Sequence, residues 1–124
     1  MAKAAIYDVI SDGNTSLRIG GDIDADLNIQ LSSNADVGVR SVLSFMLKAE
    51  DPNNLDFRLS IINGNNNTTE ILRTTVSSNV WRVWQEVVDA NVLTATGNKL
   101  RIKVLSGGGT LVISDIVLLY FTNA

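Results

Sequence analysis

The chain has 124 residues, a formal net charge of −3, and neither histidine nor cysteine. Disulfides and thiolate zinc sites are therefore excluded, and the acidic balance argues against binding to nucleic acid or to an anionic membrane. The length suits a single domain over residues 1–124, and many Val, Ile and Leu residues with one Pro and nine Gly favour strands joined by turns.

The N-terminal residues, MAKAAIYDV, lack the apolar run of a signal peptide. No other stretch approaches the roughly 20 apolar residues that a membrane-spanning helix needs. We therefore expect a soluble protein without a membrane partner, and the composition leaves its compartment open.

An alternation of apolar and polar residues, the period of a β-strand, is clear at residues 22–31. Asp22, Asp24 and Asp26 share the polar face. Alternating aspartates also occur in calcium loops, but same-face carboxylates in an extended strand lie about 6.5 Å apart and cannot share one ion. We therefore expect a solvated acidic face, with repulsion offset by cross-strand pairing to the basic residues of the strand at 98–104.

The alternation continues at residues 39–49 and again at 55–75, where the Asn- and Gly-rich residues 63–67 provide turn chemistry. Residues 55–75 are therefore predicted to form a hairpin. A loop at 50–54 joins this hairpin to the preceding strand. The segment after these elements, around the two tryptophans, carries β-branched valine pairs that weaken a helical interpretation.

Near the C-terminus, residues 98–104 place aliphatic side chains inward and cations outward, whereas 111–121 is apolar on both faces. The second pattern is typical of a central strand covered on both sides. The glycine tract 107–109 between these strands predicts a hairpin turn. Turn signals at this spacing predict an all-β fold, a two-sheet antiparallel jelly-roll β-sandwich.

A set of strand and turn positions carries a family resemblance. Its members are Phe45, Trp81, Leu93, Gly97, Asn98, Leu100, Ile102, Ser114, Asp115 and Ile116. In this order they resemble galactose-binding-like jelly-roll domains, and are similar to carbohydrate-binding modules of families six and thirty-five. The resemblance implies that carbohydrate is the partner. It also implies a structural calcium ion, for which Asp115 matches the ligand in the last strand and Asp8 is the nearest substitute for the early carboxylate.

Two tryptophans stand an odd number of residues apart, so strand alternation places Trp81 and Trp84 on opposite faces. Trp81 shares its face with valines, and we predict that it is part of the core. Trp84 shares its face with Arg82 and Glu86, which would make an exposed aromatic ring with a donor and an acceptor beside it. A pyranose stacks its CH face on such a ring and bonds the flanking groups through its hydroxyls. We predict that these three residues bind ligand; the competing interpretation is that Trp84 packs under a loop or at a subunit contact.

The leading hypothesis is a non-catalytic carbohydrate-binding module or lectin-like domain, with the loops at 50–54 and 63–67 as an alternative site. Without His or Cys, catalysis would need a carboxylate pair, and no pair has a diagnostic spacing. We therefore expect no enzyme. The runner-up hypothesis is a structural or assembly protein that acts through homo-oligomer contacts. The apolar residues proposed to cover a partner chain are Val112, Ile116, Leu118 and Tyr120.

Overall fold

The computed structural model describes residues 3–50 and 54–123. These residues form nine β-strands and no helix, so the described part of the chain contains no helix that could cross a membrane. The strands are β1 (Lys3–Ser11), β2 (Thr15–Leu17), β3 (Asp24–Ile29), β4 (Ser41–Glu50), β5 (Leu55–Ile62), β6 (Thr68–Val76), β7 (Arg82–Val88), β8 (Asn98–Gly107) and β9 (Thr110–Asn123). The predicted all-β class is confirmed.

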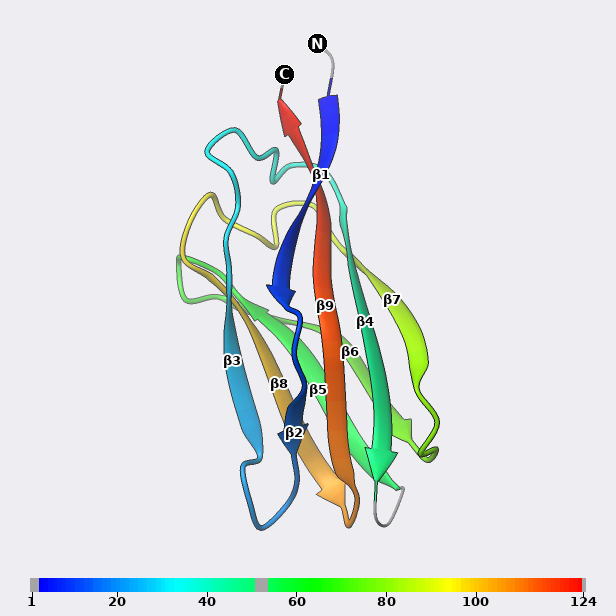
Figure 1. Cartoon of the computed structure of the whole chain (residues 1–124). Coiled ribbons are helices and arrows are strands. Elements are labelled where there is room, and N and C mark those ends of the chain that lie inside the picture. The colour runs from blue at the N-terminus through cyan, green and yellow to red at the C-terminus, as the bar shows by residue number, and fades with distance from the viewer. Residues whose placement is uncertain (1–2, 51–53, 124) are drawn as a thin grey trace.

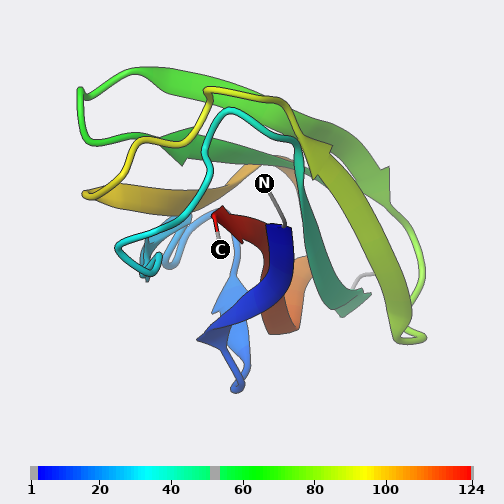
Figure 2. The ribbon, with the colours of Figure 1, turned by 90° about the horizontal axis from the view of Figure 1, so that it is seen from above.

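Two antiparallel sheets face each other as curved layers (Figures 1 and 2). The first sheet has five strands in the order β1-β9-β4-β7, with β2 also paired to β9, and the second has four in the order β3-β8-β5-β6. The connections from β4 to β5, β6 to β7 and β8 to β9 each change sheet. This arrangement is the predicted jelly-roll sandwich. The paired strands β1 and β9 bring both termini to one end of it (Figure 1).

The hydrophobic core lies between the sheets and is built from alternate residues of the strands. On β4, Leu43, Phe45 and Leu47 are at most 2% exposed, and the residues between them are only partly buried. Phe57 on β5 and Ile102 on β8 meet them from the second sheet and are fully buried. A slip of one residue would turn every apolar side chain outward, so burial of this face fixes the register of the strands.

The acidic strand β3 pairs with the basic strand β8, as the sequence predicts. Arg101 donates two hydrogen bonds to Asp26, at 2.8 and 2.9 Å, and Asp24 lies opposite Lys103. The hydrogen bonds from Arg101 lower the pKa of Asp26 below its ordinary value. Cross-strand pairing therefore offsets the repulsion among the aspartates.

The turn at residues 63–67 joins β5 and β6 as a hairpin, which confirms that prediction. Asn63 is buried, and its side chain fixes the turn. Its Oδ1 accepts from the backbone N–H groups of Asn65 and Asn67, at 2.9 and 3.2 Å, and its Nδ2 donates to Val92 O at 3.1 Å. Because these bonds use the amide of Asn63, this residue serves the fold rather than an edge site.

The glycine tract at 107–109 is not the hairpin turn that the sequence predicts. It leads from β8 in the second sheet to β9 in the first. Gly107 has a φ of 99°, and a Cβ at this position would lie 2.6 Å from the carbonyl oxygen of Asn54. Glycine is therefore required here by both its φ angle and the close passage of the chain.

Candidate functional site

The predicted ligand residues Arg82, Trp84 and Glu86 do share one face of β7, but that face is turned toward the core. Trp84 pairs with Phe45 and Glu86 with Leu43, both of which are buried. Trp84 is half-buried and packs against the core. Its indole N–H donates to Glu86 Oε1 at 2.9 Å. The prediction that this face of the strand is the open one is wrong.

The hollow beside Trp84 is small. It measures about 60 Å³, which is room for a few water molecules but not for a sugar ring. The residues that line it are Leu47, Thr75, Val76, Ser77, Ser78, Arg82 and Trp84. Trp84 lines this hollow together with residues of β6, the edge strand of the second sheet.

Trp81 lies on the opposite side of the first sheet and is 36% exposed, so its prediction as a core residue is wrong. Lys48 points outward from β4, between the buried residues Leu47 and Ala49. Its Nζ lies 4.7 Å from the centroid of the Trp81 ring. The same ammonium group lies 3.0 Å from Glu50 Oε2.

Trp81, Lys48 and Glu50 together form what we call the Trp81 site. It combines an exposed indole, a cation and a carboxylate, the same combination of groups that the sequence suggests around Trp84. The side chain of Glu50 is 47% exposed and that of Lys48 is 20% exposed. An ammonium over an indole is stabilised by about 0.5–1 kcal/mol at such a site. The ring therefore holds the cation in place while the carboxylate stays open to solvent.

Strand alternation alone could not have found this site. Apolar residues occur at both odd and even positions around β7, so the pattern does not say which face is buried. The pairing of Phe45 with Trp84 decides it. Alternation at 39–49 does predict that Lys48 faces outward, whereas the sequence places Glu50 in the predicted loop at 50–54. Their proximity to Trp81 depends on the register of β4 against β7.

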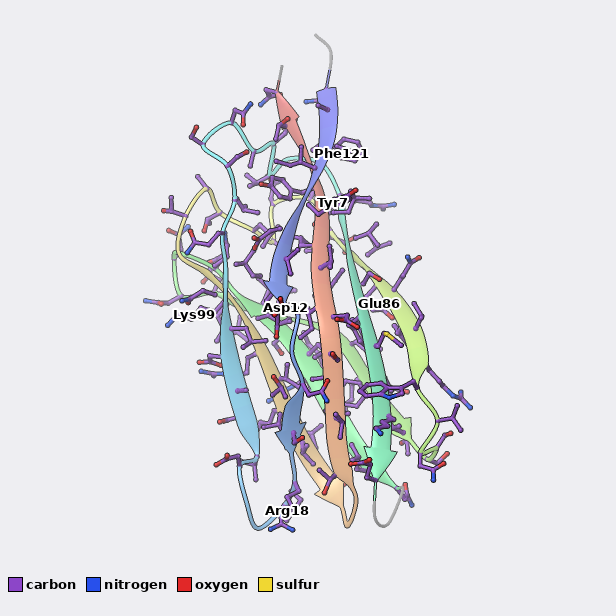
Figure 3. The ribbon with its side chains drawn as sticks, in the orientation of Figure 1. Tyr7, Asp12, Arg18, Glu86, Lys99 and Phe121 are labelled. Carbon is purple, nitrogen blue, oxygen red and sulfur yellow. The ribbon has the colours of Figure 1, made fainter. Side chains whose placement is uncertain are left out.

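A second feature lies on the same outer face of the first sheet. It is a hollow of about 460 Å³ lined by Tyr7, Val9, Val42, Ser44, Gln85, Val117 and Leu119, which we call the apolar hollow. Tyr7 is 70% exposed and Val9 is 58% exposed. Tyr7 and Phe121 lie toward the end of the sandwich that holds the termini (Figure 3). An open apolar area of this kind is typical of a binding or subunit surface.

The residues predicted to cover a partner chain are buried within the chain instead. Ile116 and Leu118 are fully buried, Val112 is 4% exposed and Tyr120 is 5% exposed. Val117 and Leu119 of β9 face outward and line the apolar hollow. The prediction that β9 is central is confirmed by its place between β1 and β4, but its outer face is partly open.

The Trp81 site and the apolar hollow are neighbours rather than one pocket. Lys48 of the first and Ser44 of the second both face outward on β4, four residues apart. At the rise of an extended strand this spacing is about 13 Å. A single sugar ring cannot contact both features.

The predicted calcium ligands do not fit a shared ion. Asp115 is exposed at a bulge in β9, with a φ of 52°. Asp8 pairs with Leu118, three residues further along β9 and so about 10 Å away, and its carboxylate accepts a hydrogen bond from Gln30 N at 2.9 Å. Calcium ligands lie about 2.3–2.6 Å from the ion. In the part of the chain that the structure describes, no group of three or more Asp, Glu, His or Cys residues could hold a metal.

Of the alternative edge site at 50–54, residues 51–53 lie outside the described residues, and Glu50 is part of the Trp81 site. The other alternative loop, at 63–67, has most of its residues exposed. Its amide Asn63 is occupied in the turn, as described above. The amide of Asn63 is therefore not free to bind a ligand at the loop 63–67.

No protein-family model and no curated protein matches the sequence. Solved structures do match the fold. A family 29 carbohydrate-binding module from Piromyces equi has a TM-score of 0.62 at 15% identity, over 97% of this chain and 92% of that chain. A variant of a second family 29 module, made to probe ligand recognition, has a TM-score of 0.62 at 14% identity, over 97% of this chain and 87% of that chain.

A third match is the Clostridium thermocellum xylanase 10B, a chain with a family 22 binding module and a catalytic module in complex with xylohexaose. Its TM-score is 0.53 at 15% identity, over 94% of this chain and 26% of that chain. At such identities the likeness shows the jelly-roll fold. The narrower resemblance to families six and thirty-five stays a prediction.

Proposed function

We propose that this protein is a non-catalytic carbohydrate-binding domain whose ligand stacks on Trp81. The observation that carries the proposal is the Trp81 site, where an indole that is 36% exposed lies beside an ammonium and a carboxylate. The likeness of the fold to carbohydrate-binding modules supports it.

The chemistry of a sugar matches these three groups. The CH face of a pyranose is apolar and stacks on an indole, while its hydroxyls accept from an ammonium and donate to a carboxylate. Aromatic contacts of this kind contribute about 0.5–1.5 kcal/mol beyond the burial of area. A site with one aromatic ring should therefore bind in about the millimolar to micromolar range.

Trp84, Arg82 and Glu86 support a ligand less well. The indole N–H of Trp84 is already bonded to Glu86, and the ring packs against the core. The adjacent hollow of about 60 Å³ is too small for a pyranose. A sugar at this position would have to displace packed side chains.

The residue types of the chain and the pKa shifts of two of its aspartates favour binding without catalysis. The chain lacks His and Cys, so hydrolysis would need a carboxyl group with a raised pKa as the general acid. The carboxyl groups of Asp26 and Asp36 have pKa values lowered by hydrogen bonds from Arg101 and Lys3. Their shifts are opposite to those of a general acid.

A glycan array followed by calorimetry tests the proposal. We expect binding to a subset of glycans, and Trp81→Ala should weaken it at least about tenfold, the loss of about 1.4 kcal/mol expected for a stacking residue. Trp84→Phe keeps an aromatic ring in the core and is the matched control. Unchanged binding by the Trp81 variant would contradict the proposed platform.

The apolar hollow favours a second function, assembly of identical chains. Val83 and Val87 extend the apolar surface along β7 and are 67% and 50% exposed. Continuous exposed apolar area is unusual on a monomer and typical of an interface. Light scattering after size exclusion tests this function directly. A monomer at high micromolar concentration would exclude stable assembly through this face.

A further inference from the structure

We propose that the Trp81 site selects acidic sugars, with Lys48 binding the carboxylate of a uronic acid whose ring stacks on Trp81. This inference rests on the proposed carbohydrate-binding function and names its ligand class. Three observations support it: the position of the Lys48 ammonium, the solvent exposure of Glu50, which pairs with that ammonium, and the exposure that remains at Trp81.

The ammonium of Lys48 is held in place before any ligand arrives. The side chain rises from β4 between buried neighbours, and its Nζ lies 4.7 Å from the Trp81 centroid. Only 20% of this side chain is exposed, whereas a free surface lysine is mostly solvated. A group already ordered in its binding position loses little conformational entropy when a ligand binds. Lys48 is therefore a preorganised cation beside the ring.

The partner of this cation is exchangeable. Glu50 lies 3.0 Å from the ammonium, but its own side chain is 47% exposed. A lysine ammonium has three donors, so the contact with one carboxylate oxygen leaves capacity for another acceptor. A carboxylate of the ligand can therefore join Glu50 or take its place. In both cases Glu50 repels the incoming anion and limits its affinity.

A uronic acid gains more from this arrangement than a neutral sugar does. Its carboxylate forms a charge-assisted hydrogen bond with the ammonium, which is about twice as strong as a bond between neutral groups. Its ring retains the CH face that stacks on an indole. As a residue Trp81 stays 36% exposed with the ammonium in place, and we assign the stacking to this accessible part.

The test compares matched pairs of small sugars by low-affinity calorimetry. The probes are methyl β-glucuronide with methyl β-glucoside, and methyl α-galacturonide with methyl α-galactoside. We expect at least one acidic member to bind about tenfold more tightly than its neutral counterpart, the difference that a single charge-assisted bond provides. Raising the salt concentration should shrink that preference, since part of it is electrostatic.

Three variants separate the roles of the charges. Lys48→Met keeps the length of the side chain and should abolish the preference: the affinity for the acidic sugar should fall about tenfold more than that for the neutral sugar, which loses only a hydrogen bond from the ammonium to a hydroxyl. Glu50→Gln should raise the affinity for the acidic sugar by about threefold, since a repulsive charge is removed. Lys99→Met, on the outer face of the other sheet, is the matched control and should change nothing.

The outcomes distinguish this inference from the function it rests on. Equal binding of acidic and neutral sugars by the native protein, with loss of both in Trp81→Ala, would overturn the acidic preference and keep the carbohydrate site. A preference that survives Lys48→Met, and also survives Lys48→Gln as a second variant of confirmed melting temperature, would overturn the role of Lys48. Binding of neither pair, together with an empty glycan array, would overturn the proposed function and this inference with it.

Discussion

Trp81 and Trp84 lie three residues apart and both have a cation and a carboxylate nearby, yet they differ in what remains open to a ligand. Trp84 faces the core opposite Phe45 and donates its N–H to Glu86. Trp81 lies on the outer face, with the ammonium of Lys48 4.7 Å from its ring centroid. A short stretch of sequence with the right residue types is therefore insufficient to define a sugar site. The accessible face of the ring decides which set can bind.

The largest expected effect is on stability, and it separates the two rings. Trp84→Ala should reduce the free energy of unfolding by about 2 kcal/mol, somewhat less than a fully buried tryptophan because the ring is half-buried. Trp81→Ala should reduce the free energy of unfolding by less than about 1 kcal/mol, as is usual for exposed positions. Urea denaturation of both variants measures the difference. If Trp81→Ala lowered the free energy of unfolding more than Trp84→Ala, Trp81 rather than Trp84 would face the core in solution.

The second effect concerns the apolar hollow on the outer face of the first sheet. If identical chains associate through the apolar hollow, Val87→Lys should convert the assembly to monomers, because an ammonium would be buried in an apolar contact without a partner. Light scattering measures the mass. Ile19→Lys is the matched control, since Ile19 is 49% exposed and lies outside both sheets. Loss of assembly in both variants would point to a general effect of charge.

A smaller effect is expected from the ion pair on the second sheet. The folded-state pKa of Asp26 is lowered, so its contribution to stability is present above the ordinary pKa of the carboxyl and is lost as the pH falls through the folded value. The pair is on the surface, so Asp26→Asn should cost less than about 1 kcal/mol at neutral pH. The cost should vanish in acid. Denaturation curves at neutral and acidic pH test the sign, and a cost that grows in acid would contradict it.

The smallest effect is expected from calcium. Since Asp8 and Asp115 do not fit one ion, a chelator should leave the melting temperature unchanged, and Asp115→Asn should not alter the response to added calcium. Saturation at about 100 times the dissociation constant would add about 2.7 kcal/mol. A rise of several degrees with calcium would therefore reveal a donor set other than this pair.

The architecture could be predicted because most strands have one buried face. Alternation at β4, β5 and β8 marks that face without ambiguity, and the acidic β3 indicates its basic partner. The turn at Asn63 follows from residue types that tolerate unusual φ angles. Alternation and turn chemistry are local, and the complementary charges of β3 and β8 can be seen in each strand separately, so the sequence alone contains these signals.

The errors have one cause, which is that they depend on pairing between distant segments. Both faces of the segment around β7 carry apolar residues, and the pairing with β4 selects the buried one. The glycine tract at 107–109 looks like a hairpin turn locally, but its two strands pair in different sheets. The contact between Lys48 and Trp81 joins β4 to the residue just before β7, and these segments are far apart in the chain. No local pattern could have indicated it.

The central claim is that a sugar binds to the outward ring of Trp81 and not to the inward ring of Trp84. The most direct measurement is an NMR titration of the two indole N–H signals with a glycan selected from the array, each signal assigned from a single Trp→Phe variant. We predict that the Trp81 signal shifts with saturation while the Trp84 signal, held by Glu86, stays in place. Movement of the Trp84 signal with a stationary Trp81 signal would contradict it.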